Sequence, residues 1–382
     1  MVHAVSVRER RGVPEVSWPQ VLAWRLLRQL LEPRGTAKAP DVARALVGIQ
    51  AQLASAAELA VAVRQRRPKP GEVDRALWVD RTLVKTWAMR GTLHLLPSDA
   101  AATFVASFAG LRPWEAKAWG KYHGISAAEV DRVCEAISAV LGAEPLTREE
   151  LTAEIAEHVR SNRIARKLGS GWSELLKPAA FQGLLCQGPP RGRSVTFVAP
   201  SAWVKGWTVP AVDEAGSLLV RWYLRAHGPA TVQHFADWWA RQRASAVRPW
   251  FERLGDELIT VDVEGMEAFA LAEDLSTLRR AKPTGVVRLL PNFDQYVLAS
   301  GRNDEAILPA RQKTKVSRQA GWISKVVLLG GRIAGVWELG DDAGVEVELF
   351  EPVPIPALQQ EAQHLGRFLG RELSVTTRRA RR

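Results

Sequence analysis

The chain has 382 residues, of which 47% are hydrophobic and 24% are charged. This composition is typical of a folded protein and excludes disorder over most of the length, which is enough for about two to four small domains. The formal net charge is +11, with 40 arginines against 12 lysines, and this balance favours an anionic partner over a cationic one.

Several classes of protein have no counterpart in this sequence. The only cysteines, Cys134 and Cys186, each lie in an apolar helical pattern, which excludes a disulfide framework and fits a reducing cytoplasm. There is no zinc-type Cys/His spacing, no Gly-rich phosphate loop and no G-x-S-x-G motif, so we expect neither a metal nor a cofactor. We also expect no membrane attachment, because no signal peptide precedes the first charged residues and no apolar run is long enough to span a bilayer.

In chain order, the sequence predicts one arrangement used three times, in which helices are followed by a short hairpin. The first copy, 17–110, begins with a capping box from Ser17 to Gln20 that opens a helix. Two further helices are predicted at about 41–49 and 55–66. The segments 83–89 and 92–96 then alternate like strands and are separated by Arg90 and Gly91, as in a hairpin.

The second copy, 111–210, contains two more capping boxes. Ser126 and Thr147 each precede a glutamate by three residues and open an apolar-faced helix. The apolar segment 172–187 predicts the third helix of this copy, followed by a turn at 188–193 and a strand at 194–199.

The third copy, 211–282, has the clearest pattern. Helices are predicted at 216–227, after the cap residue Thr231, and at about 244–254. Strands at 257–263 and 266–272 follow, joined by Glu264 and Gly265. Three helices with a two-stranded wing indicate a winged helix. Because neighbouring residues on a helix point in different directions, we expect either Trp238 or Trp239 to lie on a contact surface.

Beyond residue 283 the hydrophobic period changes to two. Strands are predicted at 285–299, 325–339 and 344–350, and a helix at 356–370. Residues 371–382 predict a frayed basic tail. We therefore expect an α+β fold, mainly α, with three tandem winged-helix units, a small antiparallel β unit with a helix at 283–370, and the tail.

Two stretches of the chain concentrate positive charge. Residues 158–193 hold seven Lys/Arg and one acid, and residues 306–337 hold six Lys/Arg and none. Either stretch alone is equally consistent with an ordinary solvated surface. Together, on tandem winged helices, they favour nucleic acid, because such residues neutralise phosphates. The residues that we expect to bind DNA there are Arg191, Arg193, Lys313, Lys315 and Arg318.

The most distinctive motif is Gly48-Ile49-Gln50-Ala51-Gln52, which follows an apolar helical pattern. Residues two apart point to nearly opposite sides of a helix, so the two glutamines converge only at a helix end or an irregular turn. From the residues alone, glutamines near a helix end are most simply interpreted as solvated or bonded to backbone.

Longer segments carry a resemblance to a known family. The stretches 45–64 (ALVGIQAQLASAAELAVAVR), 83–96, 289–302 and 328–339 resemble the AlkZ/YcaQ-type winged-helix DNA glycosylases of bacteria, and the resemblance covers roughly 17–370. It implies a glycosylase that removes bulky N-alkylated purines and unhooks interstrand crosslinks, with Gln50 and Gln52 as catalytic residues. The Gln-x-Gln form is similar to the self-resistance glycosylases of antibiotic-producing actinomycetes. A second branch of the family has Asp in place of the second Gln and has broader crosslink activity. This chain lacks that carboxylate, which argues against broad crosslink activity.

The implied chemistry suits a pair of amides. An N7- or N3-alkylated purine is already cationic and leaves as a neutral base, so what remains is to position a water and to stabilise positive charge on the sugar. No lysine adjoins the motif, which argues against a lyase step through a Schiff base. The implied partner is double-stranded DNA carrying an alkylated purine or a crosslink. We expect a cytoplasmic, nucleoid-associated monomer, since three units in one chain make dimerisation unnecessary.

Two residues of the first hairpin are further candidates for DNA binding. Arg90 lies at the turn, where it equally fits a solvated tip, and His94 lies on a strand, where a structural role competes with a functional one. The alternative function is a non-catalytic winged-helix regulator, and a third is a drug-sequestering protein with a deep apolar pocket. Release of a base separates the first function from the other two.

Overall fold

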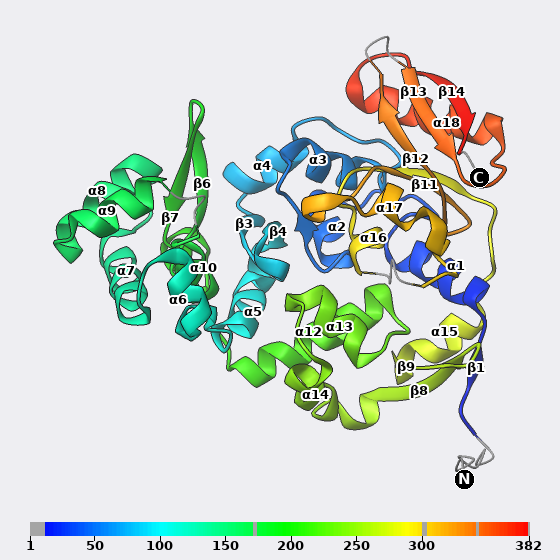
Figure 1. Cartoon of the computed structure of the whole chain (residues 1–382). Helices are drawn as coiled ribbons and strands as arrows, with labels where there is room; N and C mark the ends of the chain where they lie inside the picture. Colours follow the sequence, from blue (N-terminus) through cyan, green and yellow to red (C-terminus); the bar gives the residue numbers. More distant parts are fainter. Residues whose placement is uncertain (1–11, 171–173, 300–303, 341–343, 381–382) are drawn as a thin grey trace.

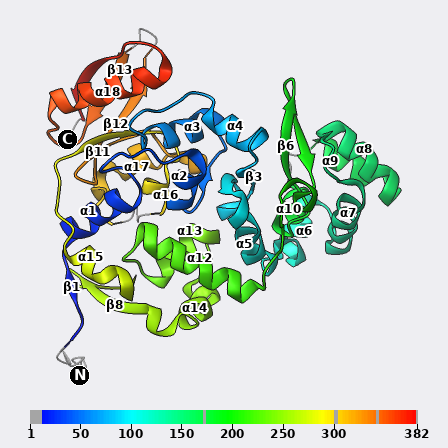
Figure 2. The same ribbon diagram turned by 180° about the vertical axis from the view of Figure 1, so that it is seen from behind.

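The structure is a computed structural model that describes residues 12–170, 174–299, 304–340 and 344–380. It is a mixed α+β fold with more helix than strand. Figure 1 shows the first described residues at the lower right edge of the molecule, residues 39–62, in blue, near its centre, and the C-terminal sheet and helix, in orange and red, at one corner. The segment drawn in cyan and green projects on the opposite side, and Figure 2 shows the same arrangement from behind.

One order of elements occurs three times: a helix, a short strand or bridge, two or more helices and a hairpin. The first repeat spans residues 39–97, and its sheet has the order β2-β4-β3. Its elements are α2 (Ala39–Ala45), β2 (Ile49–Gln50), α3 (Ala54–Ala62), α4 (Glu72–Trp78), β3 (Leu83–Trp87) and β4 (Leu93–Pro97). The sequence analysis missed α4, which begins after Gly71 in the left-handed conformation (φ 77°).

The helix that precedes this repeat in the sequence packs against helices from later in the chain. Helix α1 (Trp18–Arg28) begins with the predicted capping box of Ser17 and Gln20. It packs against α12 and α15, and its Arg25 donates from Nη2 to the Pro229 carbonyl at 3.0 Å. Helix α5 (Ser98–Ala109) leads from the first repeat to the second and packs along α12.

The second repeat spans residues 127–198, and its sheet has the order β5-β7-β6. The connection into it is formed by η2 (Pro113–Glu115) and α6 (Lys117–His123). Its elements are α7 (Ala127–Val140), β5 (Leu146–Thr147), α8 (Arg148–Val159), α9 (Asn162–Ser170), α10 (Lys177–Phe181), β6 (Cys186–Arg191) and β7 (Ser194–Val198), with α11 (Pro200–Trp203) after it. The hairpin β6–β7 stands out from the molecule in Figure 1.

The predicted helix at 172–187 is only partly correct. Residues 172–173 lie outside the described residues, and helix α10 ends at Phe181. Gly183, with a φ of 72°, then turns the chain into strand β6. Cys186 therefore lies in a strand and not in a helix. Burial raises the pKa of the Cys186 thiol to about 12, and it does the same for Cys134 in α7, so neither thiol is an activated nucleophile.

The third repeat spans residues 212–271 and agrees with the predicted elements. They are α12 (Val212–His227), α13 (Val232–Ala240), α14 (Ala244–Glu252), η3 (Gly255–Glu257), β8 (Leu258–Val263) and β9 (Met266–Leu271), followed by η4 (Ala272–Asp274) and α15 (Leu275–Arg279). Ala230 forms a bridge to Phe269 at the position of the short strand. On the other side of the hairpin, β1 (Glu15–Val16) pairs in parallel with β8.

The expectation that Trp238 or Trp239 lies on a surface is wrong, because both are buried, at 2% and 3% exposure. Helix α13 is covered on two sides. The Trp238 ring packs on Tyr223 of the same repeat at 4.9 Å, and Trp239 stacks on Phe108 of α5 at 5.3 Å. Trp238 thus packs within its own repeat, and Trp239 packs against the helix that leads from the first repeat to the second.

The C-terminal sheet has the order β10-β11-β12-β13-β14, with a parallel pair only at β13–β14 among these strands. Its strands are β10 (Val287–Leu290), β11 (Val326–Leu329), β12 (Arg332–Leu339), β13 (Gly344–Leu349) and β14 (Ser374–Arg379). The helical elements around it are α16 (Gln295–Ala299), η5 (Ala310–Gln312), α17 (Lys313–Val316), η6 (Gln319–Gly321) and α18 (Ile355–Leu369).

Two predictions for this region are corrected. The predicted strand 285–299 ends at Leu290, because Asp294 bonds the Tyr296 backbone N–H at 2.9 Å and helix α16 begins there. The predicted frayed tail forms strand β14 at 374–379, whose outer residues Arg378 and Arg379 are exposed. Residues 381–382 lie outside the described residues. The predicted helix at 356–370 is confirmed by α18.

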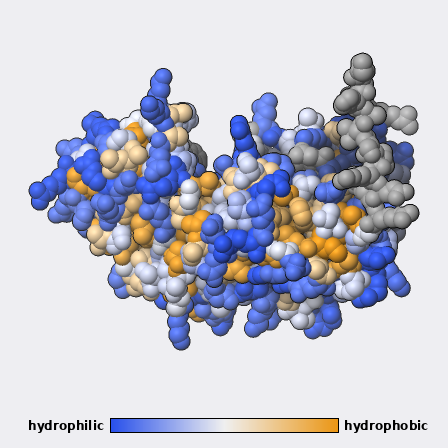
Figure 3. All heavy atoms as spheres, turned by 90° about the horizontal axis from the view of Figure 1, so that it is seen from below, coloured by the Kyte–Doolittle hydropathy of each residue, from blue (hydrophilic) through white to orange (hydrophobic). Residues whose placement is uncertain are grey.

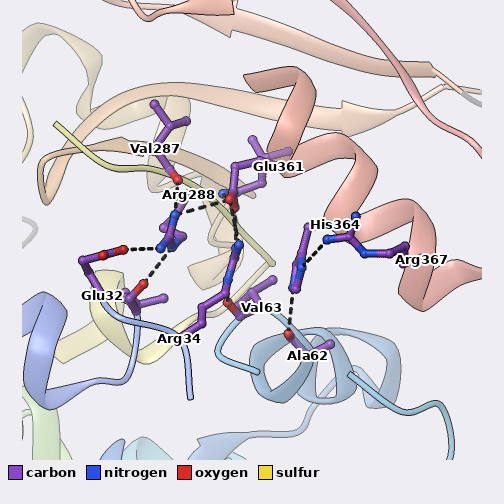
Figure 4. Close-up of polar contacts among 11 residues, drawn as sticks. Glu32, Arg34, Ala62, Val63, Val287, Arg288, Glu361, His364 and Arg367 are labelled. Carbon is purple, nitrogen blue, oxygen red and sulfur yellow. Dashed lines mark hydrogen bonds and ion pairs between the residues drawn. The ribbon is translucent and has the colours of Figure 1, made fainter. Parts of the chain in front are cut away.

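Buried ion pairs join the C-terminal sheet to the first part of the chain. Figure 4 shows Glu361 of α18 between two arginines: Arg34 Nη1 lies 2.8 Å from Oε1, and Arg288 Nη1 lies 3.3 Å from the same oxygen. Arg288 also pairs with Glu32. Arg64 and Asp294, both without exposed side-chain surface, form a bidentate pair at 2.8 Å.

The outer surface is predominantly hydrophilic. In the view from below, hydrophobic residues gather in the middle of the face and hydrophilic residues cover its edges (Figure 3). No helix in the part of the chain that the structure describes combines the length and the apolar character needed to cross a bilayer.

Candidate active site

The Gln-x-Gln motif begins on a strand: Gln50 is the last residue of β2, and Gln52 lies at a bend between β2 and helix α3. Helix α2 ends at Ala45, and Val47 and Gly48, with φ angles of 57° and 92°, turn the chain into β2. A Cβ on Gly48 would lie 2.9 Å from both Leu96 Cδ2 and Met89 Cε, so this turn admits only glycine without a shift of its neighbours.

Strand β2 pairs antiparallel with β4, with Gln50 opposite His94. The ladder continues one residue further, where the Ala51 N–H donates to the Leu93 carbonyl at 2.7 Å. The chain leaves β2 through a bend at Gln52 and does not continue as a helix, and both glutamines contact the β3–β4 hairpin.

Both glutamines have their carbonyl oxygens engaged. Gln50 is 6% exposed, and its Oε1 accepts from Arg90 Nη2 at 3.2 Å. Gln52 is exposed, and its Oε1 accepts from the Leu93 backbone N–H at 3.2 Å. Since an arginine and a backbone N–H only donate, these contacts fix which end of each amide is oxygen. Neither Nε2 group bonds to another described residue, so both remain able to donate.

Arg90 connects the motif to the third repeat. It occupies the β3–β4 turn in the left-handed conformation, with a φ of 58°, inside the 3-10 turn η1 (Met89–Gly91). Its side chain is half-buried rather than extended into solvent. One guanidinium nitrogen, Nη1, donates to the Trp238 carbonyl at 2.5 Å while Nη2 bonds Gln50. Arg90 thus fixes the amide of Gln50 against helix α13.

His94 has no exposed surface, and we therefore correct the expectation that it binds DNA. Its ring packs beneath the turn at Gly48, whose Cβ position lies 3.7 Å from His94 Cδ2. Burial, with a smaller effect of the Arg90 charge, lowers the pKa of His94 to about 3. The ring is neutral near pH 7, with Nδ1 donating to the Thr92 carbonyl at 2.9 Å and Nε2 without a partner among the described residues.

The other predicted DNA-binding residues lie on two separate elements. Arg193 is exposed at the tip of the β6–β7 hairpin, while Arg191 pairs with Glu150 at 2.8 Å. Lys313 and Arg318 are exposed on and after α17, and Lys315 pairs with Glu348. The hairpin and α17 lie on opposite sides of the first repeat in both ribbon views (Figures 1 and 2). These residues flank the repeat that carries the motif.

The contacts that distant segments of the chain make around the motif were not predicted from the sequence. Arg90 contacts the Trp238 carbonyl of the third repeat. A pocket of about 490 Å³ beside Arg90 is lined by residues of all three repeats and their connections. Such a site has no local sequence signal, because its members come together only through packing. Among the described residues, no group of three or more His, Cys, Asp or Glu side chains is arranged to hold a metal ion.

Comparisons with known proteins agree on one group. A family model described as DNA glycosylase AlkZ-like matches residues 43–370. An interstrand DNA cross-link repair glycosylase of Streptomyces sahachiroi is 41% identical over 365 residues, which cover 93% of this chain and 97% of that protein. The solved structure of Streptomyces sahachiroi DNA glycosylase AlkZ aligns with a TM-score of 0.92 at 40% identity, covering 95% of this chain and 100% of that one.

Proposed function

Since the chain belongs to the AlkZ-like family of DNA glycosylases, we propose that it hydrolyses the N-glycosidic bond of bulky N7- or N3-alkylated purines in duplex DNA, with Gln50 and Gln52 as its catalytic residues. The observation that carries the proposal is that Gln50, the last residue of β2, and Gln52, two residues after it, are both held through their carbonyl oxygens by the β3–β4 hairpin, with their NH₂ groups uncommitted among the described residues. The resemblance identified from the sequence is confirmed by the family match.

The amides fit a reaction in which the leaving group needs little help. An alkylated purine departs as a neutral base, and positive charge develops on the sugar. Each amide has a second carbonyl lone pair and a free NH₂, which together orient a water against the sugar carbon. Arg90 and the Leu93 N–H hold these amides in place before DNA binds, so little ordering is left for the transition state.

The sheet register supports a monofunctional enzyme. Lys85 of β3 lies opposite Leu95, whereas His94 lies opposite both Thr86 and Gln50. Neighbouring positions on a strand point to opposite faces, so Lys85 is on the face away from Gln50. A lysine for a Schiff-base lyase step is therefore not supplied by this sheet.

For the binding of DNA, the proposal uses the three repeats as winged-helix units. The bounds are 17–110, 111–210 and 211–282, with the β unit and helix at 283–370, to whose sheet β14 adds the last strand. Arg191, Arg193, Lys313, Lys315 and Arg318 contact phosphates on either side of the motif. The protein acts as a nucleoid-associated monomer, and it unhooks interstrand crosslinks, a proposal supported by the name of its Streptomyces relative, which is an interstrand DNA cross-link repair glycosylase. Self-resistance to a DNA-alkylating antibiotic is the biological setting that we propose.

The test measures base release directly. Duplex DNA with one N7-alkylguanine is incubated with the protein in EDTA, and abasic sites are cleaved by alkali and counted. We expect Gln50→Ala and Gln52→Ala each to lower the release rate about 100-fold, as the loss of one positioned polar group does elsewhere. A duplex with a defined interstrand crosslink serves as the second substrate.

The matched control is Gln363→Ala, which removes an exposed glutamine of α18 and is expected to leave release unchanged. If the double Gln50→Ala, Gln52→Ala variant binds DNA and still releases the base at the original rate, the assignment of the glutamines is wrong. If the unaltered protein binds a specific operator sequence and releases no base, the chain acts as a regulator instead.

A further inference from the structure

Trp322 is the one tryptophan with an exposed side chain among those that the structure describes. Its side chain is 39% exposed, and it follows the 3-10 turn η6 in the connection from α17 to β11. A single exposed apolar residue is common on protein surfaces and needs no explanation by itself. Three further features distinguish Trp322: a rigid backbone, an aromatic support beneath the ring, and free cations beside it.

The turn that carries Trp322 is held by backbone hydrogen bonds. Ser317 and Ile323 form an antiparallel bridge across it, and the Arg318 N–H donates to the Trp322 carbonyl at 2.8 Å. The Trp322 N–H in turn donates to the Gln319 carbonyl at 3.2 Å. Because both backbone groups of Trp322 are engaged, little conformational entropy remains to be lost when its ring meets a ligand.

The ring itself has an aromatic support. Phe293 is buried, and its ring meets the Trp322 ring in a T-shaped arrangement, with centroids 5.1 Å apart and planes inclined by 73°. Such a pair contributes more than the burial of its area alone. The support restricts the indole on the protein side and leaves the exposed part of the ring as a fixed apolar surface.

Hydrophobic packing connects this aromatic pair to the Gln-x-Gln motif. Leu53, the residue directly after Gln52, packs against a hydrophobic cluster that contains both Phe293 and Ile323. Ile323 is the neighbour of Trp322 in the sequence, and Asn292, the neighbour of Phe293, donates from Nδ2 to the Ile323 carbonyl at 2.9 Å. The turn with Trp322 thus belongs to the part of the C-terminal unit that packs against the first repeat.

Hydrogen bonds provide a second connection to the motif. Gln295, two residues after Phe293, accepts from Trp238 Nε1 at 3.4 Å. The carbonyl of Trp238 accepts from Arg90, and Arg90 also donates to Gln50 Oε1 at 3.2 Å. The segment that supports the Trp322 ring is therefore joined to both candidate catalytic residues, to Gln52 by packing and to Gln50 by hydrogen bonds.

Positive charge accompanies the exposed ring. Arg311 and Lys313, on η5 and α17, are exposed, and neither forms an ion pair with another described residue. The Ser324 N–H donates to the Val316 carbonyl at 2.9 Å, which ties the end of α17 to the residues after Trp322. Free cations beside an exposed indole are the combination by which proteins bind bases without reading their sequence, since the charges follow the phosphates and the ring stacks on a base.

We propose that Trp322 stacks on a base that has lost its stacking neighbour in the duplex next to the lesion. The inference rests on the proposed function only in that duplex DNA enters the site, and it adds a stacking residue from the C-terminal unit. A continuous stack of base pairs offers no free base face to an indole, whereas a helix opened at a lesion does. Trp322 therefore favours the binding of opened DNA and takes no part in cleavage of the glycosidic bond.

The test uses two lesion-free duplexes of one sequence, so that binding is measured without base release. One duplex contains a single unpaired 2-aminopurine, and in the other this base is paired with thymine. Fluorescence anisotropy of an end label gives the affinity for each, and 2-aminopurine emission reports stacking of the unpaired base. We expect the unaltered protein to prefer the unpaired duplex and to quench its emission. Trp322→Ala is expected to lower the affinity ratio about 10-fold and to abolish the quenching.

Two further variants serve as controls. Trp322→Phe keeps an aromatic ring at the position and is expected to retain the affinity ratio within about threefold. Tyr122→Ala removes an exposed ring of α6 and is expected to change neither the ratio nor the quenching. Because the two affinities are measured with one preparation of each variant, partial loss of folded protein does not alter their ratio. The salt dependence of binding stays the same in Trp322→Ala, since no charge is removed.

The outcomes separate this inference from the proposed function. An unchanged ratio with unchanged quenching in Trp322→Ala overturns the stacking contact, and so does an equal loss of affinity for both duplexes. If sedimentation shows a dimer of the unaltered protein that Trp322→Ala dissociates, the ring belongs to a protein interface and the inference is wrong. If the unaltered protein quenches the unpaired base and yet releases no N7-methylguanine, the stacking contact is supported and the proposed glycosylase function has failed.

Discussion

Arg90 contributes to the candidate site by what it holds and not by where it projects. A hairpin-tip arginine usually extends into solvent or toward a phosphate, but this one spans from Gln50 Oε1 to the Trp238 carbonyl. The left-handed turn at φ 58° points the side chain back toward the strands. The two hydrogen bonds use two different nitrogens of a planar fork, which a lysine cannot reproduce.

A positioning role makes a distinct kinetic prediction for Arg90→Lys. We expect kcat for base release to fall about 10-fold while KM stays within about twofold, because the amide of Gln50 loses its orientation and DNA contacts persist. Single-turnover and steady-state rates on N7-methylguanine duplexes measure both constants. An increase in KM with an unchanged kcat would instead identify Arg90 as a DNA contact.

At the scale of elements, the β6–β7 hairpin is the part of the second repeat that extends furthest from its helices (Figure 1). Gly192, with a φ of 59°, forms its tight tip. The two arginines at this tip differ in availability, since Arg191 is paired with Glu150 and Arg193 is exposed. The exposed arginine can therefore contact a DNA phosphate directly, whereas Glu150 competes with a phosphate for the other arginine.

This difference predicts opposite effects on DNA affinity. Arg193→Ala is expected to weaken binding and to lower the slope of log K against log salt by about 0.9, the value for one phosphate contact. Glu150→Gln is expected to strengthen binding, because Arg191 is released to a phosphate. Fluorescence anisotropy across a salt series measures both. Identical slopes for the unaltered protein and both variants would show that the hairpin does not contact the DNA backbone.

How far the sequence predicts such elements depends on how local their causes are. The capping boxes at Ser126 and Thr147 and the turn at Glu264 were predicted because neighbouring residues determine them, and each is confirmed. Gln50 and Gln52 were singled out by their motif, but the two-residue strand Ile49–Gln50 was not predicted, since only the pairing with β4 makes it a strand. The burial of Trp239 likewise depends on packing against α5, a helix far from it in the sequence.

The whole molecule is held together by ion pairs between segments far apart in the sequence. Arg64 follows α3 and Asp294 precedes α16, yet their side chains are completely buried against each other. Arg64 also donates from Nε to the Gln29 carbonyl at 2.9 Å, which ties in the segment after α1. Loss of one partner leaves a charge without solvent or counter-ion, so this pair couples the first repeat to the C-terminal sheet.

Asp294→Ala is accordingly expected to lower the free energy of unfolding by about 3–5 kcal/mol, as for other broken buried pairs. The double variant Arg64→Met, Asp294→Leu should recover part of this loss, because no unpaired charge remains. Asp99→Ala, which breaks the exposed pair of Arg44 and Asp99, should cost about 1 kcal/mol or less. Urea unfolding curves measure all three, and equal losses for Asp294→Ala and Asp99→Ala would contradict the coupling.

Strand β1 at Glu15–Val16 completes its sheet only on β8 at Leu258–Val263, and β14 at Ser374–Arg379 is the last strand of the C-terminal sheet. During translation, the first strand therefore waits until β8 has left the ribosome, and β14 joins β13 only after the intervening helix α18 has been made. A nonsense mutation at Ser374 would remove β14 and uncover β13, so the cell's quality control would encounter an open sheet edge beside an otherwise complete sheet.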